Sequence, residues 1–372
     1  MRFPHRTSIV TCDPGRNTLG KVDCWQRSRE IDYTMGVTIH DVARAAGVSV
    51  ASASRALSGR RRVTPEVAER VARAVAELGY QPNAIAKALR DQTTGTIGMV
   101  VPGIGNPFFT TIVEAVEREL QNSGTDLLLC ASQYSPQVEA RRLETLLARR
   151  VDGLIISPCD IEASVPAVLD AARRVPLVQV DRYIEGGGAD WVGVDDEAGV
   201  TLAAEHVIAG GARSVSFAGS RLVSSSARLR LSGFERTAAR AGVEVLPALL
   251  GEFTLEWGVE AGRRLLDTGR LPDAVVCAND EIAVGLVRSL RLGGVRVPED
   301  VAVVGFDDVG HATMCDPPLS TVRQPVEEMA AEAVRLLGQV KAGDPRPAQR
   351  IAIAPRLVVR QTSRPVTAGV AE

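Results

Sequence analysis

The first clear pattern of apolar and polar positions lies between residues 38 and 78, where apolar residues recur every three or four positions. This spacing predicts short helices that each bury one face. Gly47 ends the first helix, because glycine adopts the left-handed conformation without steric cost, and Ser49 suits the N-cap of a second helix that reaches about Leu57. Thr38 and Asp41 have the spacing of a capping box. The stripe of the first helix consists of Ile39, Val42, Ala43 and Ala46. The pattern predicts a helix-turn-helix.

A third helix is predicted to follow. Thr64, Pro65 and Glu66 combine an N-cap, a proline at the first helical position and an acidic residue in the first turn. Its apolar positions are Val67, Val71, Val75 and Leu78. An ordinary helical hairpin on a larger domain would explain the first two helices alone. The third helix, directly after the basic run Arg60-Arg61-Arg62, favours a small helical domain that binds DNA.

From Thr96 onward the pattern changes to short, continuous apolar runs separated by helical stretches. Such runs are typical of parallel sheets that are covered by helices on both faces. The stretch is too long for one ordinary sheet, so we expect an α/β core of two doubly wound lobes. The strand-like runs are Ile97–Val101, Leu127–Cys130, Leu154–Ile156, Leu177–Val180, Val215–Phe217, Ala274–Cys277 and Val301–Phe306. Helices are expected between them, for example over Thr111–Asn122 and Gln137–Arg150.

The charge distribution separates the two regions. The whole chain has a net charge of −2, but the segment Val37–Asp91 has nine Lys and Arg against five Asp and Glu. A basic N-terminal segment in an otherwise acidic chain is typical of a segment that contacts the phosphates of nucleic acid. No cysteine forms a C-x-x-C pair and no histidine lies at zinc spacing, so we expect reduced thiols, no metal and no cofactor. Without a membrane span or a signal peptide, a cytoplasmic, nucleoid-associated location is expected.

Several motifs together resemble the headpiece and hinge helix of the LacI/GalR (lactose-repressor) family of bacterial transcription regulators. The resemblance continues to about Thr362, and the core is similar to that family's periplasmic-binding-protein-like core. One departure is Ala53, where the family usually has a β-branched residue, so looser packing is expected there. The motifs are T-I-x-D-V-A-x-x-A-G-V-S from Thr38, S-R-A-L-S-G from Ser54, V-T-P-E from Val63, G-Y-x-P-N from Gly79 and A-x-x-L from Ala86.

The resemblance implies a division of the chain. Residues 1–36 are expected to be a disordered or non-native extension, with Met35 as a plausible natural start. Residues 37–82 form the headpiece, 83–92 the hinge helix, 93–362 the core and 363–372 a tail. The chain is expected to cross between lobes near Val194, Val322 and Ile351. Lobe 1 would then hold about 95–194 and 323–350, and lobe 2 about 195–322 and 351–362.

The headpiece residues expected to contact DNA lie mainly on the second helix. Small side chains at its first turn let it lie deep in a major groove. The hinge is too short to be helical alone, so it is expected to fold when two copies pair on DNA, with Leu89 as a minor-groove wedge. A flexible linker without DNA contacts is the alternative. The candidate DNA-binding residues are Thr38, Ser49, Val50, Ala51, Ser54, Arg55, Arg60, Asn83, Ala86, Lys87 and Leu89.

Polar residues concentrate just after the predicted core strands, where open α/β sheets bind ligands. Carboxylates, amides and guanidinium groups bond neighbouring hydroxyls, and aromatic rings cover a sugar's apolar face. The resemblance implies Asp181, Arg230, Asn279 and Asp307 as polar contacts, with Ser226 and Gln324 beside them. The full candidate set for the ligand is Phe108, Phe109, Asp181, Arg182, Ser226, Arg230, Phe253, Asn279, Asp307 and Gln324.

Two alternatives apply to individual residues. An Asp that follows a strand is often a helix N-cap, and we expect that role for Asp280 and Asp308 but not for Asp181 or Asp307. Arg230 could be a structural salt-bridge partner rather than a ligand contact. Gly103 and Gly105 lack the third glycine of a dinucleotide fingerprint, and Pro107 occupies the turn.

These patterns predict an effector-responsive repressor that binds palindromic double-stranded operator DNA as a homodimer. Its effector is expected to be a small molecule, a sugar or sugar derivative, bound between the lobes. A solute-binding protein of a sugar transporter would share the core but has no use for the headpiece. An enzyme is not expected, because neither a nucleophile with its base nor a cofactor loop is present.

Overall fold

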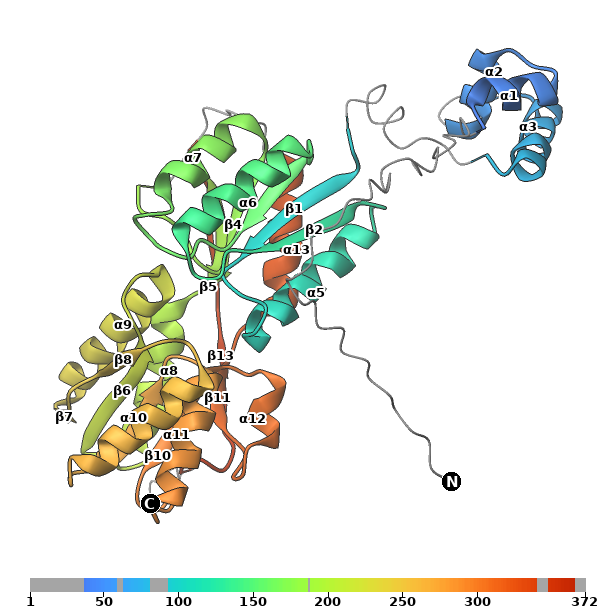
Figure 1. Cartoon of the computed structure of the whole chain (residues 1–372). Helices are drawn as coiled ribbons and strands as arrows, with labels where there is room; N and C mark the ends of the chain where they lie inside the picture. Colours follow the sequence, from blue (N-terminus) through green and yellow to red (C-terminus); the bar gives the residue numbers. More distant parts are fainter. Residues whose placement is uncertain (1–36, 59–62, 81–92, 187, 340–346, 365–372) are drawn as a thin grey trace, which may run out of the picture. The chain divides into compact units, whose positions relative to one another are not determined.

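The computed structural model describes residues 37–58, 63–80, 93–186, 188–339 and 347–364 (Figure 1). They form two compact units, divided between Asn83 and Ala84, which are described separately. No described helix is long and apolar enough to cross a membrane.

The first unit is the predicted three-helix headpiece, with α1 (Ile39–Ala46), α2 (Val50–Ser58) and α3 (Pro65–Leu78). The Asp41 carboxylate accepts hydrogen bonds from the backbone N–H (3.0 Å) and hydroxyl (2.7 Å) of Thr38. Gly47 adopts φ 62°, which is the left-handed conformation expected at the end of α1. Ser49 caps α2 by accepting a bond from the N–H of Ser52 (3.1 Å). The local helix signals are therefore confirmed, and Ala53 lies fully buried in the small core.

Lobe 1 of the core contains a six-stranded sheet in the order β12-β5-β4-β3-β1-β2, in which every pair is parallel. Helices α5 and α13 cover one face and pack together, and α6 and α7 cover the other (Figure 1). Edge strand β2 leaves Leu128 and Leu129 exposed. Its elements are β1 (Thr96–Val101), α5 (Pro107–Gln121), β2 (Asp126–Ala131), α6 (Pro136–Ala148), β3 (Gly153–Ile156), α7 (Val165–Arg174), β4 (Leu177–Val180), β5 (Asp190–Val194), α13 (Val326–Gln339) and β12 (Arg350–Ile353).

Lobe 2 contains a sheet in the order β13-β11-β10-β9-β6-β7, with β8 also paired to β6. Helices α8 and α9 pack as one pair, and α10 and α11 as another. Gly258 and Gly285 let α10 and α11 approach, because a Cβ at either position would meet a backbone oxygen at 2.2 Å. Its elements are α8 (Asp196–Ala209), β6 (Ser214–Ser220), α9 (Ser225–Ala241), β7 (Glu244–Val245), β8 (Leu249–Gly251), α10 (Leu255–Asp267), β9 (Ala274–Cys277), α11 (Asp280–Leu292), β10 (Ala302–Asp307), α12 (Gly310–Met314), β11 (Ser320–Arg323) and β13 (Arg356–Val358).

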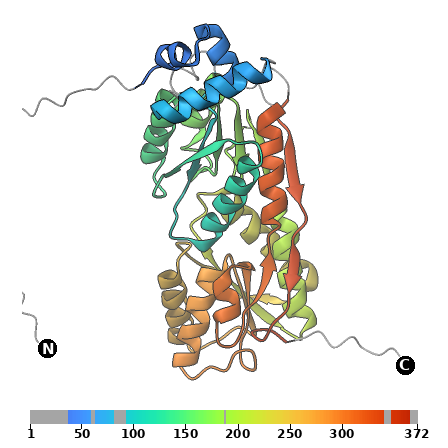
Figure 2. The ribbon, with the colours of Figure 1, turned by 90° about the vertical axis from the view of Figure 1, so that its right-hand side faces the viewer.

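The chain crosses between the lobes after β5, after β11 and after β12. The third crossing comes after Ile353, slightly later than expected, because β12 continues through Ile351 as a strand of lobe 1. Only Ala354 and Pro355 separate β12 from β13, so the chain runs on into lobe 2 and β13 pairs antiparallel with β11. Figure 2 shows these two strands following one another along one edge of the core. This antiparallel pair is the exception to the predicted parallel sheets.

Candidate functional site

A small pocket lies between the lobes, at the carboxyl ends of the strands. All ten residues that the sequence nominated for a ligand line it, and the structure adds Asn106. The additional residue caps α5, where its side chain accepts a hydrogen bond from the N–H of Phe108 (3.0 Å). Its position at the start of the N-P-F-F run, two residues before Phe108, was the available signal.

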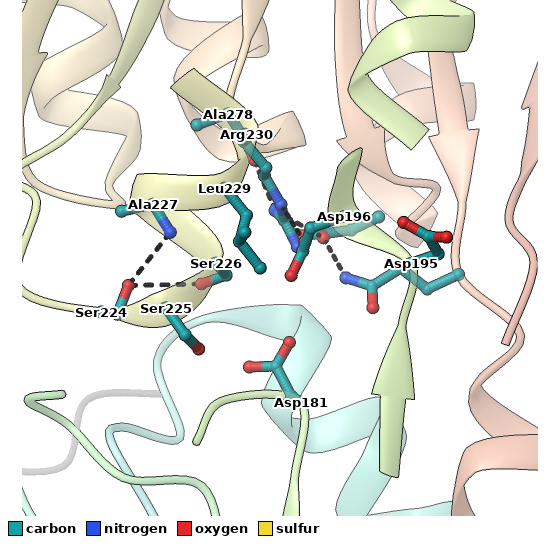
Figure 3. Close-up of polar contacts among 12 residues, drawn as sticks. Asp181, Asp195, Asp196, Ser224, Ser225, Ser226, Ala227, Leu229, Arg230 and Ala278 are labelled. Carbon is teal, nitrogen blue, oxygen red and sulfur yellow. Dashed lines mark hydrogen bonds and ion pairs between the residues drawn. The ribbon is translucent and has the colours of Figure 1, made fainter. Parts of the chain in front are cut away.

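An unusual backbone conformation places the side chains of Asp181 (lobe 1) and Asp307 (lobe 2) at the pocket. Asp181 follows β4 with φ 63°, and Asp307 ends β10 with φ 113°. Residues other than glycine rarely adopt such positive φ values, and they persist where surrounding contacts over-determine them. For Asp181 these contacts include its N–H bond to Val192 (3.0 Å) and its carbonyl, which accepts from the Trp191 indole (3.0 Å). In Figure 3, Asp181 points toward Ser226 and Asp196 of the other lobe.

Arg230 is held by several partners inside lobe 2. Its Nε lies 2.7 Å from Asp196 Oδ1, and its Nη1 donates to the Ala278 carbonyl (2.6 Å). The guanidinium also lies 3.7 Å from the ring centre of Phe306. The side chains of Arg230 and Asp196 are 4% and 1% exposed (Figure 3). Arg230 therefore has the structural salt bridge that was the alternative to a ligand contact, and two of its three nitrogens are already engaged.

Arg182 lies between two aromatic rings, one from each lobe. Its guanidinium carbon is 5.4 Å from the ring centre of Phe109 and 5.1 Å from that of Phe253. Its Nε is 3.6 Å from Asp181 Oδ2, which is too long for a hydrogen bond. Cation–π contacts with both rings restrict where the guanidinium can lie. The two rings thus hold the Arg182 side chain in place, and its Nε can still donate a hydrogen bond to a ligand in the pocket.

Three buried polar atoms of the pocket have no hydrogen-bond partner among the described residues: Arg182 Nε, Asn279 Nδ2 and Gln324 Oε1. The other ends of two of these side chains are anchored. Asn279 Oδ1 accepts from the N–H of Ile282 (3.0 Å), and Gln324 Nε2 donates to Asp307 Oδ1 (2.7 Å). A buried polar atom without a partner costs about 1–3 kcal/mol. Two donors and one acceptor are therefore prepared for a polar molecule.

Carboxylates outnumber guanidinium groups around the pocket. Burial raises the pKa of Asp181 to about 6 and that of Asp307 to about 7. Burial also raises the pKa of Asp196 and of Asp280, which lies directly after Asn279. An electrostatic surplus of acidic groups favours a neutral ligand over an anion, and neutral hydroxyl groups donate well to carboxylates.

The expectation that Asp280 and Asp308 cap helices is wrong. Asn279 caps α11, and the Asp280 carboxylate instead accepts from the N–H of Val309 (2.9 Å) and the hydroxyl of Thr321 (2.5 Å). The carboxylate of Asp308 accepts from Arg323 Nε (2.6 Å) and Arg360 Nη2 (2.6 Å). Both acids bind segments far along the chain, which local spacing cannot reveal.

The headpiece candidates that the structure describes lie at the N-cap of α1 and along α2. Thr38, Ser49, Ala51 and Arg55 are exposed, and Val50 and Ser54 are half-buried. Arg55 Nε donates to the carbonyl of Ala51 (3.1 Å), so its side chain runs back along the helix toward Val50. The candidates Arg60, Asn83, Ala86, Lys87 and Leu89 lie outside the described residues.

We expect the unliganded core to lose stability as pH rises from about 4 to about 7. The raised pKa values of Asp181 and Asp307 mean that the folded state binds more protons than the unfolded state in this window. The stabilising contribution is complete below the unfolded pKa of about 3.9 and is lost as pH passes the folded values. Urea denaturation across this range should show a smaller loss for Asp307→Asn, and equal slopes in both proteins would contradict the assignment.

Comparison with known proteins adds two matches along the chain. Residues 38–83 match the bacterial regulatory proteins of the lacI family, and residues 204–363 match the periplasmic binding protein-like domain. A solute-binding protein of a transporter would not need the matched DNA-binding headpiece, so this match argues against that alternative.

Several known proteins match this chain over nearly the whole length of both sequences. DegA, a transcriptional regulator of Bacillus subtilis, is 32% identical over 89% of this chain and 99% of its own. The transcriptional repressor PurR of Haemophilus influenzae is 34% identical, over 88% and 99%. The ribose operon repressor of Escherichia coli is 33% identical, over 87% and 98%. The lac repressor dimer bound to operator and the anti-inducer ONPF superposes with a TM-score of 0.81 at 29% identity, over 88% of this chain and 99% of its own.

Proposed function

This chain belongs to the lacI family of bacterial regulatory proteins, and we propose that it is a transcriptional repressor controlled by a small neutral sugar bound between the lobes. The observation that carries the effector assignment is the set of three partnerless buried polar atoms in the pocket. They lie with two buried acids and three phenylalanines, which is the combination that hydroxyl groups and an apolar sugar face require.

The charge of the pocket narrows the effector class. Arg230 is paired with Asp196, and Arg182 lies beside Asp181. Both guanidinium groups of the pocket already lie beside a carboxylate, so neither is available to neutralise a phosphate group. The Asp307 carboxylate would in addition repel a phosphate. The effector is accordingly an unphosphorylated sugar, and ribose is a first candidate because one relative is a ribose operon repressor.

Binding to the full-length protein tests this assignment. Calorimetry with D-ribose, D-glucose, cellobiose, ribose 5-phosphate and adenine separates a monosaccharide from a disaccharide, an anion and a nucleobase. We expect one neutral monosaccharide to bind, and to raise the unfolding free energy by about 2.7 kcal/mol at 100 times its dissociation constant. Preferential binding of the phosphate ester or of adenine would overturn the assignment.

Control of DNA binding requires a difference between two states. The effector must bind the operator-competent and operator-incompetent arrangements with different affinity, because equal affinity shifts no equilibrium. We propose that closure of the lobes supplies this difference, and that two copies bind the two halves of a palindromic operator. We propose a cytoplasmic location, because the protein must reach its operator DNA.

Arg55→Ala is expected to weaken operator binding by about 1–3 kcal/mol, because the exposed guanidinium on α2 reads a base edge. The loss should be concentrated at one operator position, whereas random DNA should bind nearly as before. A panel of operators with single base changes, measured at one fixed salt concentration, shows the pattern. Arg73→Ala, on the exposed side of α3, is the control. An equal loss on operator and random DNA would assign Arg55 to phosphate contacts instead.

A further inference from the structure

We infer that Arg228 determines effector affinity from outside the pocket, by joining the two lobes when they are closed. This inference rests on the proposed function for its ligand arm, although the contacts themselves are independent of the effector's identity. Arg228 belongs to the first turn of α9 in lobe 2, and it does not line the pocket.

Both acidic partners of Arg228 belong to lobe 1. Its Nη2 lies 2.6 Å from Glu162 Oε1, and its Nη1 lies 2.9 Å from Glu185 Oε1. Its Nε donates to the Leu222 carbonyl of its own lobe (2.9 Å), which fixes the guanidinium plane. We call Arg228, Glu162 and Glu185 the interlobe bridge. The planar guanidinium of arginine can bind two glutamates from different loops with two separate nitrogens, whereas a lysine has only one nitrogen.

Backbone contacts beside the bridge join the same segments. The N–H of Ile161 donates to the Val223 carbonyl (2.7 Å), and the N–H of Tyr183 donates to the Ser225 hydroxyl (3.1 Å). The segments that follow β3 and β4 therefore meet the segment that follows β6. None of these strands leads directly into a crossing between the lobes, so the contacts depend on closure and not on chain connectivity.

The residues that make the hydrogen bond beside the bridge, Tyr183 and Ser225, are each next to a residue of the pocket. Tyr183 directly follows Arg182, and Ser225 directly precedes Ser226, while Arg182 and Ser226 both line the pocket. Figure 3 shows Ser225 and Ser226 at the end of α9 that faces Asp181. Contacts that hold these segments together also bring the pocket residues of the two lobes within reach of one ligand.

The expected effect is moderate, because the three side chains are partly exposed. Arg228 is 39% exposed, Glu162 64% and Glu185 54%. Each such pair changes an equilibrium by about 1.4-fold to fivefold. Because the pairs exist only between closed lobes, Arg228→Ala should lower the ratio of closed to open molecules about threefold to tenfold. This change increases the open population, which exchanges hydrogen, and decreases the closed population, which binds the ligand. The exchange acceleration multiplied by the loss of apparent ligand affinity should therefore be about threefold to tenfold.

Hydrogen exchange of the unliganded full-length protein tests the bridge without an effector. Peptides that contain Ile161 and Tyr183 should exchange faster in Arg228→Ala than in wild type, by up to about tenfold. Arg236→Ala is the matched control, because Arg236 lies on the same helix and forms a 2.7 Å pair with Glu197 within lobe 2. Unchanged exchange in Arg228→Ala, or equal acceleration in Arg236→Ala, would overturn the inference.

Two further measurements complete the test: a mutant cycle between Arg228 and its two glutamates, and the affinity of the variants for D-ribose. Glu162→Gln with Glu185→Gln should reproduce the acceleration, and adding Arg228→Ala should cause no further change, whereas additive effects would contradict the bridge. In calorimetry with D-ribose, Arg228→Ala should bind more weakly than Arg236→Ala, and this factor multiplied by the exchange acceleration should be about threefold to tenfold. If D-ribose does not bind wild type while exchange responds as expected, the effector assignment fails and the bridge stands. If D-ribose binds both variants equally, the bridge does not determine affinity.

Discussion

Arg230→Ala is expected to destabilise the core by about 3–5 kcal/mol, because removing one partner of a buried ion pair leaves the other charge uncompensated. The Asp196 side chain is 1% exposed and would lose its 2.7 Å bond to Arg230 Nε, while the Ala278 carbonyl would lose its bond to Nη1. Urea denaturation followed by tryptophan fluorescence measures the change, since Trp191 lies in lobe 1 and Trp257 in lobe 2.

The control for Arg230 is again Arg236→Ala, on the same helix. Its pair with Glu197 is exposed, so a loss of no more than about 1 kcal/mol is expected. The double variant Asp196→Asn with Arg230→Met should be more stable than Arg230→Ala, because it removes the Asp196 charge together with the cation that neutralises it. A cost for Arg230→Ala as small as that of the control would show that water reaches Asp196 in solution and that the pair is not structural.

Arg182→Ala is expected to weaken effector binding by about 2–5 kcal/mol, which corresponds to about 30-fold or more. Arg182 is stacked between Phe109 and Phe253, and its buried Nε has no hydrogen-bond partner among the described residues. The fold should tolerate the change better than it tolerates Arg230→Ala. Asp181, with its pKa already raised to about 6 by burial, can take a proton once the neighbouring cation is removed.

The measurement for Arg182 is operator affinity with and without the sugar that binds wild type. Operator binding in the absence of sugar should be retained, and the response should require a far higher sugar concentration. Ser226→Ala is the graded comparison, because its hydroxyl already bonds to Ser224 (3.2 Å) and contributes only about 0.5–1.5 kcal/mol. A response of Arg182→Ala at the wild-type sugar concentration would remove Arg182 from the effector site.

The headpiece shows how much local sequence determines. A capping residue, an apolar stripe and a terminal glycine specify each end of α1, and all act within a few residues of one another. The strands with continuous apolar runs, such as β3 and β9, were likewise predictable because a buried parallel strand needs no particular partner to be recognised. The short strands β11 and β12 were missed, since their residues are mixed in polarity and become strands only by pairing with β10 and β5.

The sequence indicated the pocket residues in two ways. Asp181, Arg182, Asn279 and Asp307 follow predicted parallel strands, which end at one edge of a sheet, whereas Ser226, Arg230 and Gln324 were implied by the resemblance to the family. The pairing of charges depends on the tertiary structure. Asp196, far from Arg230 along the chain, neutralises it, while Arg182 Nε has no hydrogen bond among the described residues, and Asp308 binds Arg323 and Arg360 instead of capping a helix. Local spacing acts through bonds within a few residues, whereas ion pairing depends on distances that packing between distant segments creates.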